Sequence, residues 1–376
     1  MIQWVSAAAV MATFALPAGA ASDPEEEILL GKFLDVARTS KYQYQLGDKP
    51  PKSARRSVPP RCSADGEETT LRCVREADGS KALVPWKLKP EAQKRFPEAE
   101  QLFHANKLEE ALAAYDEVLV LEPDFAPAWL FSGDVPYHLG DYEEALRRFR
   151  KAIELDNTMA QAHSFSADAL AHLGRQEEAV EEYLLAMVFR PTYTEAQEHL
   201  RDLLADMGYF FYRLPFEAPD DAFPGKKGKK IYVPAVGQGK NSTAWHAFSL
   251  CQAVWQFEPT FEPEKTAKDA PWNLGRDAQC VMTFWQAWGP IIEPLKKAKE
   301  EGKNPELADF SAPAQHVARV LRRNLLTGYV LVEYWGTRCP SLMRLLSDEL
   351  IREALAYLKG ACIVPDARRE PPKRGR

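Results

Sequence analysis

Small and aromatic residues recur with a period of 34 between residues 92 and 208. Asn and Gly tolerate the left-handed backbone that ends many helices, so their recurrence marks the end of the first helix in each unit. A period of this length predicts stacked pairs of helices. We therefore expect about three helical pairs and a final helix over residues 194–207. Three phases of the period carry this pattern: Ala111, Ala145 and Ala179; Tyr115, Phe149 and Tyr183; and Asn106, Gly140 and Gly174.

Small residues also occur where paired helices must approach each other closely, at Ala99, Gly133 and Ala167. The middle unit resembles the tetratricopeptide repeat family at six positions: Trp129, Gly133, Tyr142, Ala145, Phe149 and Ala152. The resemblance covers residues 92–208. It implies a short helical solenoid whose first helices line a concave surface that holds another polypeptide. Pro97 predicts that the first helix of the first unit begins at that residue.

An acidic residue precedes a histidine by four positions in each unit: Glu100 and His104, Asp134 and His138, Asp168 and His172. The resemblance implies that these pairs face the concave surface, together with Leu130 in the middle unit and Asp202 in the final helix. The candidate partner-binding residues are therefore Glu100, His104, Leu130, Asp134, His138, Asp168, His172 and Asp202.

The acid–histidine pairs have three interpretations. They are ordinary one-turn helix contacts copied by duplication, or part of a groove for a cationic or mixed-charge peptide, or metal ligands. In the family, a carboxylate clamp of Lys and Asn side chains grips the acidic C-terminus of a ligand. Acids and histidines replace those residues here, so acidic C-termini are disfavoured as ligands. Helices pack about 8–10 Å apart and metal bonds measure about 2 Å, so three histidines on successive helices do not easily share one ion. We expect neither a metal nor a cofactor, and the first two interpretations stay open.

The first 21 residues have the features of a secretory signal. Residues 2–21 carry no charged side chain, and Ala18, Gly19 and Ala20 are small enough for signal peptidase. The segment is barely long enough to span a bilayer, and an uncleaved anchor is the alternative. We expect an exported protein, periplasmic or secreted, with no membrane span after signal cleavage. The formal net charge of -6 argues against nucleic acid as a partner.

The six cysteines are an even number in a chain with an export signal, which favours disulfides. A metal cluster is disfavoured because the sequence has no C-x-x-C pair. Proximity along the chain suggests three local bridges: Cys62–Cys73, Cys251–Cys280 and Cys339–Cys362.

Periodicity and turn residues predict further elements outside the repeats. We expect a helix from Ser22 to about Ala37 and a hairpin with strands over 69–76 and 81–84. Later helices are expected over 242–256, 276–288, 311–326 and 341–358, and strands over 231–233 and 329–334. The predicted fold is mainly α, with these segments: a signal at 1–21, an N-terminal helix and clipped hairpin at 22–91, repeats at 92–208, a linker at 209–230, an α-rich domain at 231–365 and a basic tail at 366–376.

These features predict an exported interaction module or assembly scaffold that binds a protein or peptide in an acidic, histidine-containing groove. No G-x-S-x-G or H-E-x-x-H spacing is present, and we predict no catalytic residue. The alternative is an enzyme of unknown class in residues 231–365, with the repeats recruiting its substrate. A deep pocket with convergent polar groups in that region would favour the enzyme.

Overall fold

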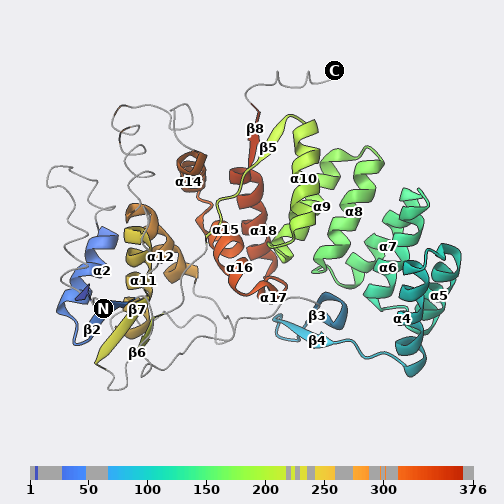
Figure 1. Ribbon diagram of the computed structural model, residues 1–376, viewed down its shortest axis with the longest axis horizontal. Helices are drawn as coiled ribbons and strands as arrows, with labels where there is room; N and C mark the ends of the chain where they lie inside the picture. Colours follow the sequence, from blue (N-terminus) through green and yellow to red (C-terminus); the bar gives the residue numbers. More distant parts are fainter. Residues whose placement is uncertain are drawn as a thin grey trace. The chain divides into compact units, whose positions relative to one another are not determined.

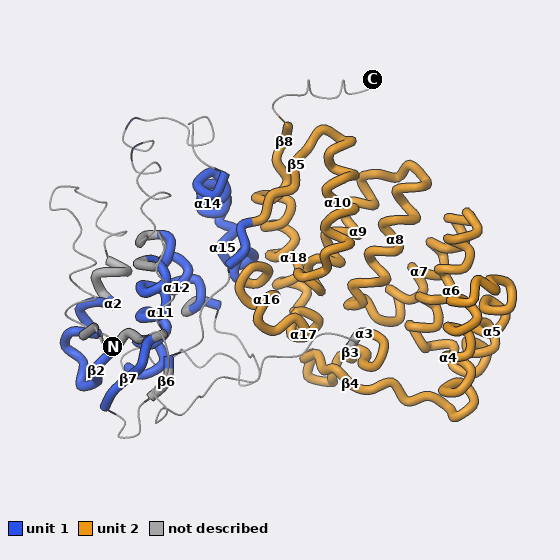
Figure 2. Tube along the Cα trace, viewed as in Figure 1, with its two compact units in different colours: residues 1–61, 214–330 blue, residues 62–213, 331–376 orange. Residues whose placement is uncertain are grey.

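The computed structural model describes residues 5–6, 28–47, 67–216, 222–224, 229–234, 242–258, 274–287, 297, 301 and 312–366. The chain divides into two compact units, coloured separately in Figure 2. Unit 1 comprises residues 1–61 and 214–330, and unit 2 comprises residues 62–213 and 331–376. This division differs from the expected boundaries, because residues 331–365 belong to the same unit as the repeats.

Consecutive helices form most of unit 2 (Figure 1). They are α4 (Pro90–His104), α5 (Leu108–Leu121), α6 (Ala126–His138), α7 (Tyr142–Leu155), α8 (Ala160–His172), α9 (Gln176–Phe189) and α10 (Thr194–Asp206). The pairs α4–α5, α6–α7 and α8–α9 are the three predicted units, and α10 is the final helix. The prediction of a mainly α fold with a short helical solenoid is confirmed.

The recurring residues have the packing roles that their spacing predicts. The alanines at 111, 145 and 179 are fully buried, and the rings at 115, 149 and 183 are at most 2% exposed. The backbone φ angle is 59° at Asn106, 82° at Gly140 and 73° at Gly174. Each of these residues therefore ends the first helix of its unit in the left-handed region, as predicted.

Two local predictions were wrong. Helix α4 begins at Pro90, so Pro97 lies inside it rather than at its start. Proline suits the first turn of a helix, and Pro90 already occupies that position. Residues 329–334 are helical rather than a strand, because the end of α15 (Leu326–Tyr329) continues into the π-helix η3 (Val330–Trp335). A short apolar run does not by itself distinguish a buried helix from a strand.

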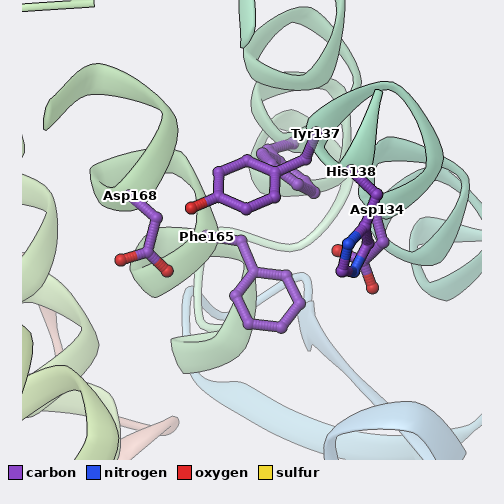
Figure 3. A pocket seen from close by; sticks show the side chains of 6 residues that line it. Asp134, Tyr137, His138, Phe165 and Asp168 are labelled. Atoms are coloured by element: carbon purple, nitrogen blue, oxygen red, sulfur yellow. The ribbon is translucent and has the colours of Figure 1, made fainter. Parts of the chain in front are cut away.

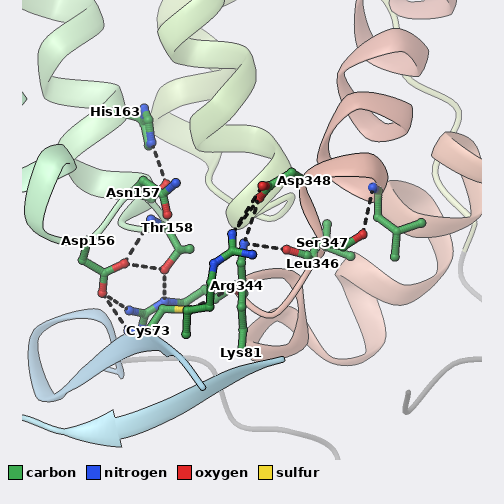
Figure 4. A network of polar contacts seen from close by, with 12 residues as sticks. Cys73, Lys81, Asp156, Asn157, Thr158, His163, Arg344, Leu346, Ser347 and Asp348 are labelled. Atoms are coloured by element: carbon green, nitrogen blue, oxygen red, sulfur yellow. Dashed lines mark hydrogen bonds and ion pairs between the residues drawn. The ribbon is translucent and has the colours of Figure 1, made fainter. Parts of the chain in front are cut away.

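The predicted hairpin is present. After the short helix α3 (Glu67–Thr70), strands β3 (Leu71–Arg75) and β4 (Lys81–Pro85) pair antiparallel, with Cys73 opposite Leu83. A buried ion pair connects the hairpin to the turn after α7 and to the C-terminal segment (Figure 4). Arg344 donates to Asp156 Oδ2 at 2.8 Å and to Thr158 Oγ1 at 3.0 Å, while the Cys73 backbone N–H donates to Asp156 Oδ2 at 2.9 Å.

The C-terminal segment packs on the last repeat. It contains α16 (Gly336–Arg338), α17 (Pro340–Met343), α18 (Asp348–Tyr357), the π-helix η4 (Leu358–Cys362) and β8 (Ile363–Pro365). Helices α17 and α18 contact α9, and β8 pairs antiparallel with β5 (Tyr209–Phe211). A fully buried Glu333 accepts two hydrogen bonds from Arg213, at 2.8 and 2.9 Å, and one from the Tyr357 hydroxyl at 2.8 Å.

Unit 1 combines a small sheet with helices. The strand order is β1 (Val5–Ser6), β2 (Gln43–Gly47), β7 (Lys230–Pro234) and β6 (Phe223–Pro224), with β2 and β7 parallel. The helices are α2 (Ile28–Thr39), α11 (Ser242–Phe257), α12 (Leu274–Ala287), α14 (Ala312–Arg322) and α15. Aromatic rings fill its core: the centroid of Phe216 lies 5.1 Å from Phe284, and that of Trp285 lies 4.9 Å from Tyr329.

None of the five cysteines that the structure describes is in a disulfide, which corrects the prediction of bridges. Cys62 lies outside the described residues, and the Cys73 thiol donates to the backbone oxygen of Arg344 at 3.4 Å. Cys339 and Cys362 are not bonded to each other. Cys251 and Cys280 come closest to the prediction, since their sulfur atoms on α11 and α12 lie 3.1 Å apart, against about 2.05 Å for a bridge.

The predicted ends of the chain lie mostly outside the described residues. Val5 and Ser6 form β1, and the rest of the predicted signal at 1–21 is not described. Of the tail expected at 366–376, only Asp366 is described. No helix within the described ranges is long and apolar enough to cross a membrane.

Candidate functional site

Glu100, Asp134 and Asp168 form an acidic column on the first helices of the three units. They lie on α4, α6 and α8, at positions 34 residues apart. Asp134 and Asp168 line the same pocket, and the charges of Glu100 and Asp168 both raise the pKa of Asp134. The duplicated sequence therefore brings like charges together along one face of the repeats.

The outer members of the acidic column have hydrogen-bond donors from second helices. The Tyr115 hydroxyl donates to Glu100, and the Tyr183 hydroxyl donates to Asp168. Asp168 also lies 2.7 Å from Nδ1 of His199, on α10. In both outer units the tyrosine follows the acid by 15 residues. Hydrogen-bond donors from a neighbouring helix therefore offset part of the free-energy cost of removing these two carboxylates from water.

Asp134 differs because residue 149, which follows it by 15, is Phe and has no hydroxyl. No hydrogen bond or ion pair to Asp134 is found within the described part of the chain. Burial is the main cause that raises the pKa of Asp134 well above its usual value, followed by the charges of Glu100 and Asp168. Burial also raises the pKa of Glu100, although the Tyr115 hydroxyl and the charge of His104 oppose it. Asp134 is thus the acid with the least compensated charge.

A pocket of about 170 Å³ opens beside Asp134 between the middle and third units (Figure 3). Its lining comprises Asp134, Tyr137, His138, Phe149, Phe165 and Asp168. The ring centroids of Phe149 and Phe165 are 5.7 Å apart, and those of Tyr137 and His138 are 6.1 Å apart. Burial, then the charge of Asp168, raises the pKa of Tyr137 to about 12, so its hydroxyl stays protonated at neutral pH. The pocket combines carboxylates with aromatic walls.

Three histidines of the predicted site are exposed at the C-terminal ends of α4, α6 and α8 and contact aromatic rings. His138 lies 5.3 Å from the Phe103 ring, and His172 stacks on Tyr142 with a centroid distance of 4.3 Å. His104 lies 6.0 Å from Phe103. The histidine hydrogen-bonded to an acid of the column is instead His199, from the helix after Asp168. At Asp168 the hydrogen-bonded imidazole therefore comes from another helix and not from the histidine four residues later, whereas the charge of His104 does act on Glu100 four residues earlier.

The other two predicted site residues, Leu130 and Asp202, differ in their exposure to solvent. Leu130 is 0% exposed and belongs to the core, which corrects its assignment to a binding surface, because a fully buried side chain offers no area to a partner. Asp202 is exposed on α10. The sequence interpretation missed His199 and Phe165. They share one phase of the period with Phe131, which is the signal that would have linked them.

A metal site is not formed by these groups. Within the described ranges no set of three or more His, Cys, Asp or Glu side chains is placed to hold a metal ion. The acids of the column interact with hydroxyls and with one imidazole instead.

A tetratricopeptide repeat family model matches residues 96–160 and 137–194. Residues 96–194 are tetratricopeptide repeats. The comparison with curated proteins finds no match. The period of 34, the helix pairs and the family model thus agree on this tetratricopeptide segment, which covers about a quarter of the chain.

Solved structures similar to the chain include several tetratricopeptide domains. The first domain of Spaghetti (RPAP3) bound to an HSP90 peptide is 21% identical, with 31% of this chain and 92% of that chain covered and a TM-score of 0.30. The Yersinia enterocolitica type III secretion chaperone SycD in complex with a YopD peptide is 18% identical, with 30% and 92% covered and a TM-score of 0.29. The second domain of human RPAP3 with an HSP70 peptide is 21% identical, with 30% and 94% covered and a TM-score of 0.29.

Proposed function

We propose that this protein is an exported interaction module whose tetratricopeptide repeats bind a cationic or mixed-charge polypeptide on the face that carries the acidic column. Concave repeat surfaces are commonly used to hold other chains. The observation that carries the proposal is the pocket between α6 and α8, where Asp134 and Asp168 lie among aromatic side chains. Acidic neighbours that raise the pKa of Asp134 favour a ligand of opposite charge.

The C-terminal segment supports this choice of face. Within unit 2 its helices α17 and α18 contact α9, a second helix, while the acids of the column belong to the first helices α4, α6 and α8. The lining of the pocket includes no residue of the segment 331–366. No observation on the described residues favours the alternative of an enzyme in residues 231–365.

A peptide display experiment tests the proposal. The full chain without its predicted signal is used to select from a random peptide library, and we expect selected peptides to be enriched in Arg and Lys. The combined variant Glu100→Gln, Asp134→Asn and Asp168→Asn removes the charges of the column and should lose this selection. The matched control is Glu109→Gln, Glu143→Gln and Glu177→Gln, which neutralises three exposed acids at equivalent positions of the second helices. Selection without basic enrichment, or equal effects of both variants, would contradict the proposal.

Export is part of the same proposal and has its own test. Expression of the intact sequence in a bacterial host, followed by fractionation and intact mass measurement, should find a chain that starts after Ala20 or Ala21 outside the cytoplasm. A full-length mass in the cytoplasmic fraction would refute export.

A further inference from the structure

The middle repeat lacks one hydroxyl that the repeats on either side use. Tyr115 and Tyr183 donate to the acids of their own units, whereas Phe149, which lines the same pocket as Asp134, has no hydroxyl to donate. The neighbouring small residue changes as well, because Ala99 and Ala167 correspond to Gly133. A Cβ at Gly133 would lie 2.5 Å from Cε1 of Phe149, so the missing side chain lets this ring lie close against α6. Two linked differences thus leave an acceptor with no donor from the described residues, and a pocket beside it.

The walls of the pocket suit a flat, delocalised cation. The rings of Tyr137, Phe149 and Phe165 line the pocket together with the Asp134 carboxyl. Cations bind aromatic faces, and arginine does so more often than lysine. The planar guanidinium also presents paired N–H groups that match a carboxylate, and it is more weakly hydrated than an ammonium group. The acid without an internal donor and the aromatic walls therefore favour the same side chain, arginine.

We infer that the pocket beside Asp134 is a socket for a single arginine side chain, an inference that rests on the proposed function for the identity of the chain that carries it. The guanidinium donates to Asp134 in place of the hydroxyl that Tyr115 and Tyr183 supply in the other units. Its flat face packs against the rings of the pocket. The acidic column as a whole attracts a basic segment, and the socket selects which of its residues enters.

The experiment uses the full chain and N-acetyl-arginine amide, which needs no polypeptide partner. Amide NMR spectra should show saturable changes at residues 133–135, 137–138 and 165–168. Citrulline carries the same shape without the charge, and its amide should cause no saturable change. Asp134→Asn should lower the affinity at least tenfold, on the order expected when one partner of a shielded charge pair is removed.

Phe149→Tyr is the sharper variant. It restores the hydroxyl present in the other units, so it should satisfy Asp134 internally and weaken arginine binding while the fold remains intact. Glu143→Gln, on the same helix α7 and exposed, is the matched control and should leave binding unchanged. Circular dichroism establishes that each variant is folded, and Asp134→Asn still tests the socket if Phe149→Tyr does not fold.

The outcomes separate the socket from the proposed function. Saturable arginine binding that Asp134→Asn and Phe149→Tyr both reduce supports the socket, whether or not peptide selection succeeds. Peptides selected by the acidic column that bind Asp134→Asn and Phe149→Tyr as well as the native chain would retain the function and overturn the socket. Absence of saturable binding, or equal binding of citrulline, would also overturn it.

Discussion

Unit 2 contains two shielded carboxyls with opposite surroundings, Glu333 beneath the C-terminal segment and Asp134 in the pocket of the repeats. Glu333 accepts hydrogen bonds from Arg213 and Tyr357. At Asp134, burial and two neighbouring acids disfavour the charged form of the carboxyl. The fully paired acid holds structure together, whereas the unpaired acid costs stability until a ligand supplies a donor. Burial alone therefore does not say whether a charged group is structural.

The largest effect is expected at the paired acid. Arg213→Ala leaves Glu333 buried without its countercharge and should lower the free energy of unfolding by about 3–5 kcal/mol. Urea denaturation of the full chain measures the change. The control is Arg147→Ala, which removes a partner of Glu144 from a more exposed pair and should cost under about 1 kcal/mol. Similar losses for both variants would contradict the view that Glu333 is a structural acid.

The next effect concerns the contact between the C-terminal segment and the last repeat. Gly336→Ala would place a Cβ 2.4 Å from Cγ of Pro191. The overlap should cost about 1–3 kcal/mol, because neither backbone can move freely in a packed contact. Thermal unfolding measures it, with Gly79→Ala as a control for strain from a positive φ angle in an open turn. An unchanged midpoint for Gly336→Ala would show that the segment packs loosely.

The unpaired acid should respond in the opposite direction. Burial and the neighbouring acids raise the pKa of Asp134 in the folded state. Its contribution to the stability of the fold is therefore most favourable at pH values below its unfolded-state pKa, and it is lost as the pH rises through the folded-state pKa. Asp134→Asn should therefore stabilise the protein at pH 7 by about 1 kcal/mol or more, with a smaller gain near pH 4. Unfolding curves at both pH values test the sign. Destabilisation at pH 7 would mean that Asp134 has an internal partner.

The smallest effects are expected at the tyrosines of the outer units. Tyr115→Phe and Tyr183→Phe each remove a hydroxyl that donates to an acid of the column. Each should cost about 1 kcal/mol, with less for Tyr183→Phe because His199 still contacts Asp168. Phe149→Tyr should show the reverse and raise the unfolding midpoint. Equal changes in sign for all three variants would break the contrast between the middle and outer units.

The sequence predicts the repeats well because residues with the same packing role recur in each of the three units. Ala111 and Tyr115 are informative only together with their equivalents one and two periods later. The helix ends at Gly140 and Gly174 follow from a local backbone requirement that needs no tertiary contact.

The pairing within the site could not be read from spacing along one helix. The imidazole beside Asp168 belongs to His199, 31 residues away on another helix, whereas His172 on the same helix as Asp168 stacks on Tyr142. The missing donor at Asp134 is visible in the sequence as Phe149 among tyrosines. Its meaning depends on knowing that the ring of a second helix reaches the acid 15 residues earlier. The C-terminal segment has no period, and its contacts with α9 are tertiary.

The two units are interleaved along the chain, since each is assembled from stretches separated by part of the other. Arg213 closes the first stretch of unit 2, and Glu333 arrives in the second, 120 residues later. During synthesis the last repeat therefore emerges long before the helices that cover α9. A fragment cut at residue 213 would leave that surface of α9 uncovered and Arg213 without its carboxylate, so the contacts of the last repeat are complete only in the full chain.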